Sequence, residues 1–242
     1  MKPVVVIPVY NHEHAIGVVV EKVRAQGLPV ILVDDGSKAS CAAVLDSLAK
    51  PPEIVVFKRA QNGGKGAAVM SGLEEASRLG YSHAVQIDAD GQHNLVDLPK
   101  FLEQANANPD ALITGQPVYD DSVPKGRLYG RYLTHIWVWI NTLSLAIKDS
   151  MCGFRVYPLP RTLAAIVPSI GKRMDFDPEI AVRLVWGGTQ VINIPTHVTY
   201  PLDGVSHFDV LWDNVRISGM HTRLFFGMLI RLPKLLWRKL AA

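Results

Sequence analysis

The sequence is poor in cysteine and has no long uncharged apolar run. Its two cysteines, Cys41 and Cys152, lie far apart among 242 residues, which argues against a disulfide framework and indicates a reducing compartment. Residues 132–147 form a largely apolar segment without Lys, Arg, Asp or Glu. It is shorter than the roughly 20 apolar residues that a membrane-spanning helix needs. We therefore predict no transmembrane helix, although this segment could lie at a bilayer interface.

Acidic side chains are absent from the end of the chain. The formal net charge is only +3, but from His221 onward the sequence has Lys and Arg residues and no Asp or Glu. The aromatic stacking residues and motifs of nucleic-acid-binding proteins are missing, so we expect no nucleic-acid partner. A basic segment of this kind favours anionic lipid instead. The apolar run at the N-terminus ends at Pro8 and is too short for a signal peptide, which predicts a cytoplasmic protein.

The basic tail also has a helical amphipathic pattern. Four basic residues fall within one arc of about 80° at helical spacing, and apolar side chains cover much of the rest. They are Arg223, Arg231, Lys234 and Arg238. Pro233 should kink this stretch or restart it as a second helix. The pattern predicts peripheral attachment to the cytoplasmic face of the inner membrane. A terminal helix packed on the domain, or a dimer contact, is the alternative.

The first half of the chain alternates short apolar runs with segments of helical periodicity. Buried strands are predicted at residues 4–9, 30–33, 54–57, 84–87 and 111–114. Helices are predicted at residues 66–79 and 95–107, and a last strand at 190–200. This alternation is typical of βαβ units and predicts an α/β fold with a mostly parallel sheet flanked by helices. We expect one catalytic domain over residues 1–209 and a C-terminal helical extension over 210–242.

Oxygen-bearing side chains follow the predicted strand at residues 84–87. Asp88, Asp90 and Gln92 occupy alternate positions and can turn toward one point, as the ligands of a hard divalent cation do. Mg²⁺ typically binds one or two carboxylates and takes its other ligands from water and substrate phosphates. A nucleotide-sugar diphosphate would supply those oxygens, and the cation would stabilise the charge on the leaving diphosphate. The pattern predicts a Mg²⁺ or Mn²⁺ site, with a solvated Asp-Gly turn as the alternative.

Two further clusters follow other strands. In Asp34-Asp35-Gly36-Ser37, a carboxylate can accept hydrogen bonds from a ribose hydroxyl or a base N–H. Asn62-Gly63-Gly64-Lys65-Gly66 opens a helix, where backbone N–H groups favour phosphate. It is not a Walker loop, because no Ser or Thr follows Lys65. Ligands of open parallel sheets bind at the carboxyl ends of the strands, so all three clusters should meet at one edge.

Four ordered motifs resemble those of family 2 glycosyltransferases, and most closely the polyprenyl-phosphate mannosyl- and glucosyltransferases, over roughly residues 4–200. They are Val6-Ile7-Pro8-Val9-Tyr10-Asn11, Val33-Asp34-Asp35-Gly36-Ser37, Asn62-Gly63-Gly64-Lys65-Gly66 and Asp88-Ala89-Asp90-Gly91-Gln92. The resemblance implies a GT-A fold and inversion at the anomeric carbon. It implies that Asp88, Asp90 and Gln92 hold the metal, with Asp88 also meeting the donor. It further implies that the nucleotide sugar is held by Pro8, Tyr10, Glu13, Asp34, Asp35 and Lys65. His12 departs from the acidic residue common after the Tyr-Asn pair.

The second half resembles the acceptor side of the same enzymes. Asp149-Ser150-Met151-Cys152-Gly153-Phe154-Arg155 is similar to their D-x-x-[SC]-G-F-R segment. By that resemblance Arg155 lies near the diphosphate or a phosphate acceptor, with a surface arginine at a strand end as the alternative. Asp177 aligns with an acidic base, which a hydroxyl acceptor needs and a phosphate acceptor does not. A carboxylate favoured at a helix start is its alternative.

Other polar residues have weaker signals. His207 could return to the metal or the diphosphate, or make an ordinary hydrogen bond. Arg127 and Arg131 could steady the diphosphate or an acceptor phosphate, or lie on an exposed helix face. Cys152 is expected to be a small buried residue rather than a nucleophile.

The segment 134–144, together with residues 216–223, is similar to glycosyltransferases of bacterial aryl-polyene pigment gene clusters. The combined prediction is an inverting, metal-dependent glycosyltransferase that uses a UDP- or GDP-sugar. Its acceptor would be a membrane-associated polyprenyl phosphate or a hydroxylated lipid or polyene. A nucleotidyltransferase and a non-catalytic nucleotide-binding membrane scaffold are the alternatives. The former should have a glycine-rich loop with Arg after the first strand, where Pro8-Val9-Tyr10-Asn11 stands.

Overall fold

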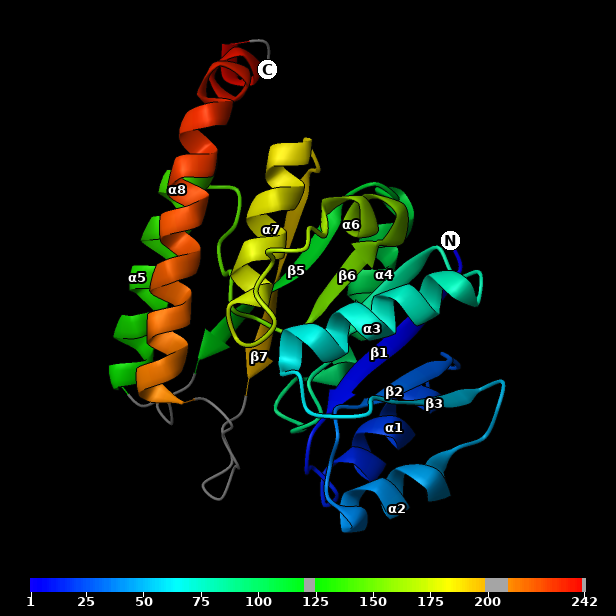
Figure 1. Ribbon diagram of the computed structural model, residues 1–242. Helices are drawn as coiled ribbons and strands as arrows, with labels where there is room; N and C mark the ends of the chain where they lie inside the picture. Colours follow the sequence, from blue (N-terminus) through cyan, green and yellow to red (C-terminus); the bar gives the residue numbers. More distant parts are fainter. Residues whose placement is uncertain (120–124, 199–208, 241–242) are drawn as a thin grey trace.

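A single sheet runs through the molecule. The computed structural model describes residues 1–119, 125–198 and 209–240. Within these ranges seven strands form one sheet in the order β3-β2-β1-β4-β6-β5-β7 (Figure 1). They are β1 (Pro3–Val9), β2 (Val30–Asp34), β3 (Ile54–Lys58), β4 (His83–Gln86), β5 (Leu112–Tyr119), β6 (Arg155–Pro158) and β7 (Val191–Val198).

The sheet is mostly parallel, as the alternation of apolar runs predicts. β1 pairs in parallel with β2 and β4, β2 with β3, and β5 with β7. The exception is β6, which lies antiparallel between β4 and β5. This strand has no counterpart among the predicted ones, because its four residues begin with a charged Arg155 and end in Pro158. Its register sets Arg155 opposite Gln86 and Tyr157 opposite Ala84.

Helices cover both faces of the sheet (Figure 1). They are α1 (Ile16–Arg24), α2 (Ala39–Leu48), α3 (Lys65–Arg78), α4 (Leu98–Ala107), α5 (Lys125–Thr142), α6 (Leu159–Ala165), α7 (Phe176–Gly187) and α8 (Val210–Leu240). Because side chains alternate along a strand, β1 sends Val4 and Val6 into one core and Val5 and Ile7 into the other. Burial of both faces explains why its sequence is apolar throughout.

The predicted elements correspond closely to the observed ones. The first five predicted strands overlap β1 to β5. Most of their boundaries differ from the observed ones by no more than one or two residues. The helix predicted over residues 66–79 is α3, and the one predicted over 95–107 is divided. A short 3₁₀ turn, η1 (Leu95–Asp97), precedes α4, because Pro99 occupies the first turn of that helix.

The C-terminal helix has two different sides. α8 packs against α5 and α7, with Ile217, Met220, Leu224 and Met228 buried in the same core as α7. One face of α8 is therefore packed on the domain. This packing is the alternative to membrane attachment that the sequence left open. Pro233 lies inside α8, and in Figure 1 the last turns depart from the direction of the rest. Among the helices described, no segment has the length and apolarity that crossing a bilayer would require.

Candidate active site

The predicted clusters meet at the edge where the parallel strands end. β1 and β2 run in register up to Val9 and Asp34, and the backbone N–H of Asp35 donates to the Val9 carbonyl at 2.9 Å. Ile87, the last residue before the Asp88 motif, donates its N–H to the Val6 carbonyl at 3.1 Å. The ends of β1, β2 and β4 therefore lie side by side.

Asp35 connects the first cluster to the glycine-rich loop. Its carboxylate accepts the backbone N–H groups of Gly63 at 3.0 Å and Gly64 at 2.8 Å, and its Oδ1 lies 2.8 Å from Arg59 Nε. Gly36 has a φ of +72°, and a Cβ there would lie 2.7 Å from the backbone nitrogen of Asn62. Only glycine fits this approach. The turn after β2 thus holds the loop before α3 in place.

The other predicted donor contacts lie at the ends of β1 and β2. The Asp34 carboxylate accepts the N–H of Ser37 at 2.9 Å, and that of Glu13 accepts the Ser40 hydroxyl at 3.1 Å. Hydrogen bonding lowers the pKa of Glu13. Pro8 is buried at the end of β1, and Tyr10 follows it, half-buried. These side chains border one edge, and their contacts with a nucleotide stay a prediction.

Lys65 joins two carboxylates at the centre of this edge. Its Nζ lies 2.7 Å from Asp88 Oδ1 and 3.0 Å from Asp177 Oδ2. Burial alone would lower the pKa of Lys65, but the carboxylates of Asp177 and Asp88 raise it above its usual range. Burial would likewise raise the pKa of Asp88, but Lys65 and a hydrogen bond from His93, 3.3 Å away, hold it low. Lys65 and Asp88 are therefore both charged at neutral pH.

A small cleft of about 70 Å³ opens beside Asp88. Its lining includes Asp88, Asp90, Gln92, His93 and Arg131. In the described part of the chain, no group of three or more His, Cys, Asp or Glu side chains could hold a metal ion by itself. The protein would therefore supply only some of the ligands of a bound cation. Asp88 Oδ1 is paired with Lys65 Nζ at 2.7 Å, and the cleft places the side chains of Asp90 and Gln92 beside that carboxylate. Such a partial ligand set fits a hard cation that also binds substrate phosphates.

Gly153 lies against the Asp88 carboxylate at the cleft. A Cβ at this position would lie 2.3 Å from Asp88 Oδ2 and 2.5 Å from Oδ1. Contacts this short are repulsive, so the backbone of the segment before β6 can approach Asp88 only because residue 153 has no side chain. The glycine of the D-x-x-[SC]-G-F-R segment therefore has a steric role at the cleft.

A chain of buried hydrogen bonds holds Asp177. Gln86 Nε2 donates to Asp177 Oδ1 at 3.1 Å, and the Tyr157 hydroxyl donates to Gln86 Oε1 at 3.1 Å. Because Tyr157 occupies the amide oxygen, Gln86 must present its NH₂ group to the carboxylate. Sequence reasoning missed Gln86 and Tyr157. The available signal was a polar Gln within the apolar run predicted at residues 84–87.

Comparison with known proteins decides the family. Residues 4–159 match the model of glycosyl transferase family 2. The chain belongs to this family. Polyprenol monophosphomannose synthase of Mycolicibacterium smegmatis is 30% identical over 223 residues, covering 85% of this chain and 80% of that protein. Undecaprenyl-phosphate mannosyltransferase of Micrococcus luteus is 26% identical over 207 residues, covering 81% of this chain and 82% of that protein.

Solved structures agree with the predicted GT-A fold. Glucosyl-3-phosphoglycerate synthase from Mycobacterium tuberculosis, in complex with Mn²⁺ and UDP-glucose, matches with a TM-score of 0.66. The match covers 94% of this chain and 78% of that chain at 13% identity, so it shows the fold alone. The predicted family and fold are confirmed. This glycosyltransferase identity favours the enzyme prediction over the nucleotidyltransferase and the non-catalytic scaffold.

Arg155 of this glycosyltransferase is fully buried. Its guanidinium donates to the carbonyls of Ser150 at 2.6 Å, Cys152 at 2.8 Å and Asp177 at 2.6 Å. The alternative of a surface arginine is wrong, because Arg155 is 0% exposed. Its bonds tie the segment before β6 to the first turn of α7, and a direct role toward phosphate stays a prediction.

The same segment anchors Arg131. Arg131 Nη2 donates to Asp149 Oδ1 at 2.7 Å, and His135 Nε2 lies 3.3 Å from Asp149 Oδ2. Although burial would raise the pKa of Asp149, Arg131 and His135 hold it low. Arg131 is thus fixed at the cleft rather than on an exposed helix face. The sequence analysis did not predict that Asp149 and His135 hold Arg131. Asp149 was recognised only as the first residue of the segment 149–155, and His135 only as part of the segment 134–144.

Of the remaining predictions, the one for Cys152 can be compared with the structure, and those for His207 and Arg127 cannot. Cys152 is buried, and burial raises the pKa of its thiol to about 12, so it stays protonated as a small core residue. His207, the fourth predicted metal ligand, lies outside the described residues, and so does the side chain of Arg127.

Proposed function

We propose that this glycosyltransferase transfers a sugar from a UDP- or GDP-sugar to a polyprenyl phosphate or a similar lipid-like acceptor, with inversion and with a divalent metal. The observation that carries the proposal is the Lys65–Asp88–Asp177 cluster beside a cleft at the carboxyl edge of the sheet. Support for the acceptor comes from the relatives, whose names give polyprenol and undecaprenyl-phosphate transferases.

The donor side is built for a diphosphate. Asp88, Asp90 and Gln92 would hold Mg²⁺ or Mn²⁺, which when bound neutralises charge on the leaving diphosphate. In the loop before α3 the N–H groups of Gly63 and Gly64 donate to Asp35, so the helix dipole rather than these two groups would attract a phosphate here. Lys65 adds a cation at the same place. His207, if it reaches the cleft, would add a further ligand.

Asp177 has a different task for each acceptor. A hydroxyl acceptor needs a base to remove its proton, and the carboxylate held by Gln86 would serve. A phosphate acceptor is already an anion, and then Asp177 positions Lys65. Arg131 lines the cleft and suits an anionic oxygen. We favour the phosphate acceptor because Arg131 lines the same cleft as Asp88, and its guanidinium could pair with an anionic acceptor.

Thermal unfolding with UDP, GDP and their sugars, with and without Mn²⁺, tests donor and metal together. One nucleotide should raise the melting temperature only when Mn²⁺ is present, since a ligand at 100 times its Kd stabilises the native state by about 2.7 kcal/mol. Neither nucleotide changing the melting temperature of folded protein would contradict the proposed donor site.

We further propose that the outer face of α5 and α8 rests on the membrane. Of the large apolar side chains exposed in the described residues, all but Met1, Val18, Val96 and Val118 belong to α5, the turn after it, or α8. They include Trp137, Ile140, Trp212, Phe226, Ile230 and Trp237. The two helices lie side by side (Figure 1), so these side chains form one surface. Apolar surface of this extent on a soluble protein marks an interaction site.

Ile230→Glu is expected to weaken flotation with anionic vesicles by about tenfold or more, because burying such a side chain is worth 1.5–3 kcal/mol. Val96→Glu is the matched control, since Val96 is 80% exposed and Ile230 79%. Equal vesicle binding by both variants, or a dimer that Ile230→Glu dissolves without changing vesicle binding, would overturn the membrane assignment.

A further inference from the structure

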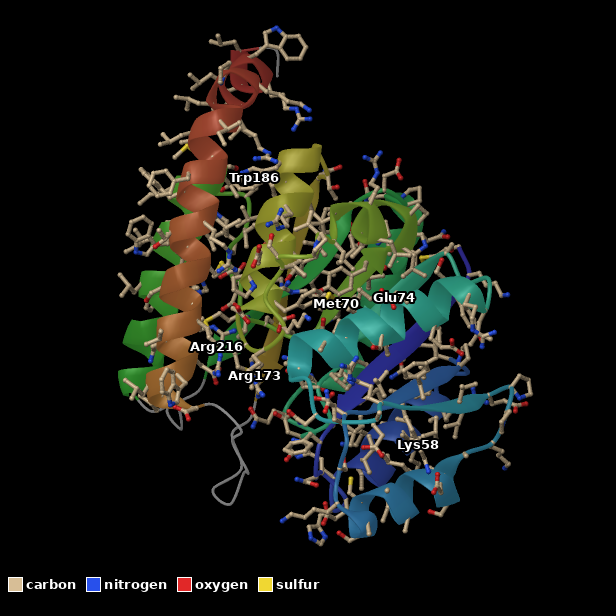
Figure 2. All side chains as sticks on the ribbon, viewed as in Figure 1. Lys58, Met70, Glu74, Arg173, Trp186 and Arg216 are labelled. Carbon is tan, nitrogen blue, oxygen red and sulfur yellow. The ribbon has the colours of Figure 1, made fainter. Side chains whose placement is uncertain are left out.

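A second, arginine-lined pocket lies far from the cleft. It has a volume of about 360 Å³ between α6, α7 and α8, and no Asp or Glu belongs to its lining. Arg161, Arg183, Arg231 and Trp186 are among the lining residues. Figure 2 shows Trp186 near the upper end of α7, whereas Arg173 and Arg216 lie near its lower end. Trp186 is nine residues from Asp177, roughly 14 Å along the helix axis.

The positive charge of this pocket is only partly neutralised. Arg231 stacks over the Trp186 ring at 4.5 Å and donates to the Gly227 carbonyl. No carboxylate within 4.0 Å pairs with it among the residues described. Arg183 shares the buried Glu179 with Arg223, so one carboxylate serves two guanidinium groups. The surroundings therefore carry an excess of positive charge.

The remaining arginine is held loosely. Arg161 pairs with Asp110 at 3.0 Å, but both side chains are exposed, at 42% and 76%. Exposed pairs of this kind contribute little, so Arg161 can exchange its partner for an anionic ligand. Arg238 adds further charge close by, because it donates to the Trp186 carbonyl at 2.9 Å.

The other walls of the pocket are apolar. Ala164, Ala165, Val167 and Leu184 also line the pocket, so the ligand that fits has an anionic group joined to an apolar part. Arg231 and Arg238 directly follow Ile230 and Trp237, two exposed side chains of the outer face of α8. A helix whose apolar face enters a bilayer holds such neighbouring basic residues at the level of the headgroups.

We propose that this pocket binds the phosphate group of an anionic phospholipid headgroup, with the glycerol and the start of an acyl chain against the apolar wall. The site is separate from the donor cleft, and it deepens the proposed membrane association by naming the lipid class. Planar guanidinium groups suit phosphate oxygens, and α8 has no acidic residue after Asp213 to oppose them.

Calorimetric titration with monomeric dihexanoylphosphatidylglycerol tests the proposal without a membrane. We expect saturable binding, and at least tenfold weaker binding of dihexanoylphosphatidylcholine. Arg161→Gln and Arg231→Gln should each weaken phosphatidylglycerol binding by about tenfold, as expected for loss of one charged hydrogen bond. Arg78→Gln is the matched control, because Arg78 is also an exposed arginine paired with a carboxylate.

The possible outcomes distinguish a lipid phosphate from inorganic phosphate, and this pocket from the donor cleft. Inorganic phosphate that binds as tightly as the lipid would overturn the lipid assignment, and unchanged binding by Arg161→Gln would overturn the site. Arg231→Gln removes a contact with Trp186 and so could disturb packing, whereas Arg161 is at the surface and keeps the test valid. The nucleotide-induced rise in melting temperature should be the same in Arg161→Gln as in the unaltered chain, which distinguishes failure here from failure of the donor site.

Discussion

Asp88→Asn is expected to lower kcat/KM for sugar transfer by about 1,000-fold, the upper range for losing one preorganised electrostatic contact in an active site. The neutral amide cannot supply the negative charge that a hard cation prefers. It also leaves the ammonium of Lys65 with Asp177 as its one carboxylate partner among the described contacts. Steady-state kinetics, together with nucleotide affinity measured with and without Mn²⁺, check both effects.

Asp46→Asn is the matched control for this change. Asp46 also pairs with a lysine, Lys58, but both side chains are about half exposed, so activity should be unaltered. Circular dichroism should give native spectra for both variants. Normal turnover in Asp88→Asn and in Asp90→Asn would show that the metal assignment is wrong.

Gly153→Ala should lower kcat by about 100-fold while the protein stays folded. The added Cβ would lie 2.3–2.6 Å from the carboxylate atoms of Asp88, so that side chain must turn away from Lys65 and His93. A misplacement of about 1 Å in an active site typically costs this much. The measurement is kcat, with Mn²⁺ affinity as a second readout that should weaken in parallel.

Gly17→Ala supplies the comparison, because a Cβ at Gly17 meets nothing within 4 Å. It lies in α1, where alanine is the better helix former by about 1 kcal/mol. Full activity in Gly17→Ala with strong loss in Gly153→Ala supports the steric argument. Full activity in both would mean that Asp88 has room to move without consequence.

The sequence predicts the fold well because its signals are local. Strands β1 to β4 are short apolar runs followed closely by polar residues, so both the strand and its carboxyl end can be recognised from adjacent residues, whereas β5 continues to Tyr119, five residues beyond the predicted end. Once the strands are taken as parallel, Asp34, Lys65 and Asp88 must converge at one edge. That convergence is what the structure contains.

The features that the sequence could not predict depend on contacts between residues far apart in the chain. β6 is four residues long and starts with Arg155, and only its antiparallel register brings Tyr157 and Arg155 to Gln86. The hydrogen bond between Gln86 and Asp177 joins residues 91 positions apart. No local spacing encodes these contacts, because the tertiary fold creates them.

The C-terminal helix could be predicted only in part. Its basic arc and apolar residues are visible in the sequence, but the same pattern serves a buried face and an exposed one. Only the packing against α5 and α7 distinguishes Leu224, which is buried, from Phe226, which is 60% exposed. The residues of the outer face therefore had to come from the structure.

Transfer of labelled sugar from UDP- and GDP-sugars to undecaprenyl phosphate, with Mn²⁺ or with EDTA, tests the central claim most directly. The account predicts label in the organic phase with one nucleotide sugar, in the presence of both metal and lipid phosphate, and none with EDTA or with Asp88→Asn. Transfer that proceeds equally in EDTA, or folded protein that releases no nucleotide diphosphate with any donor and metal, would contradict it.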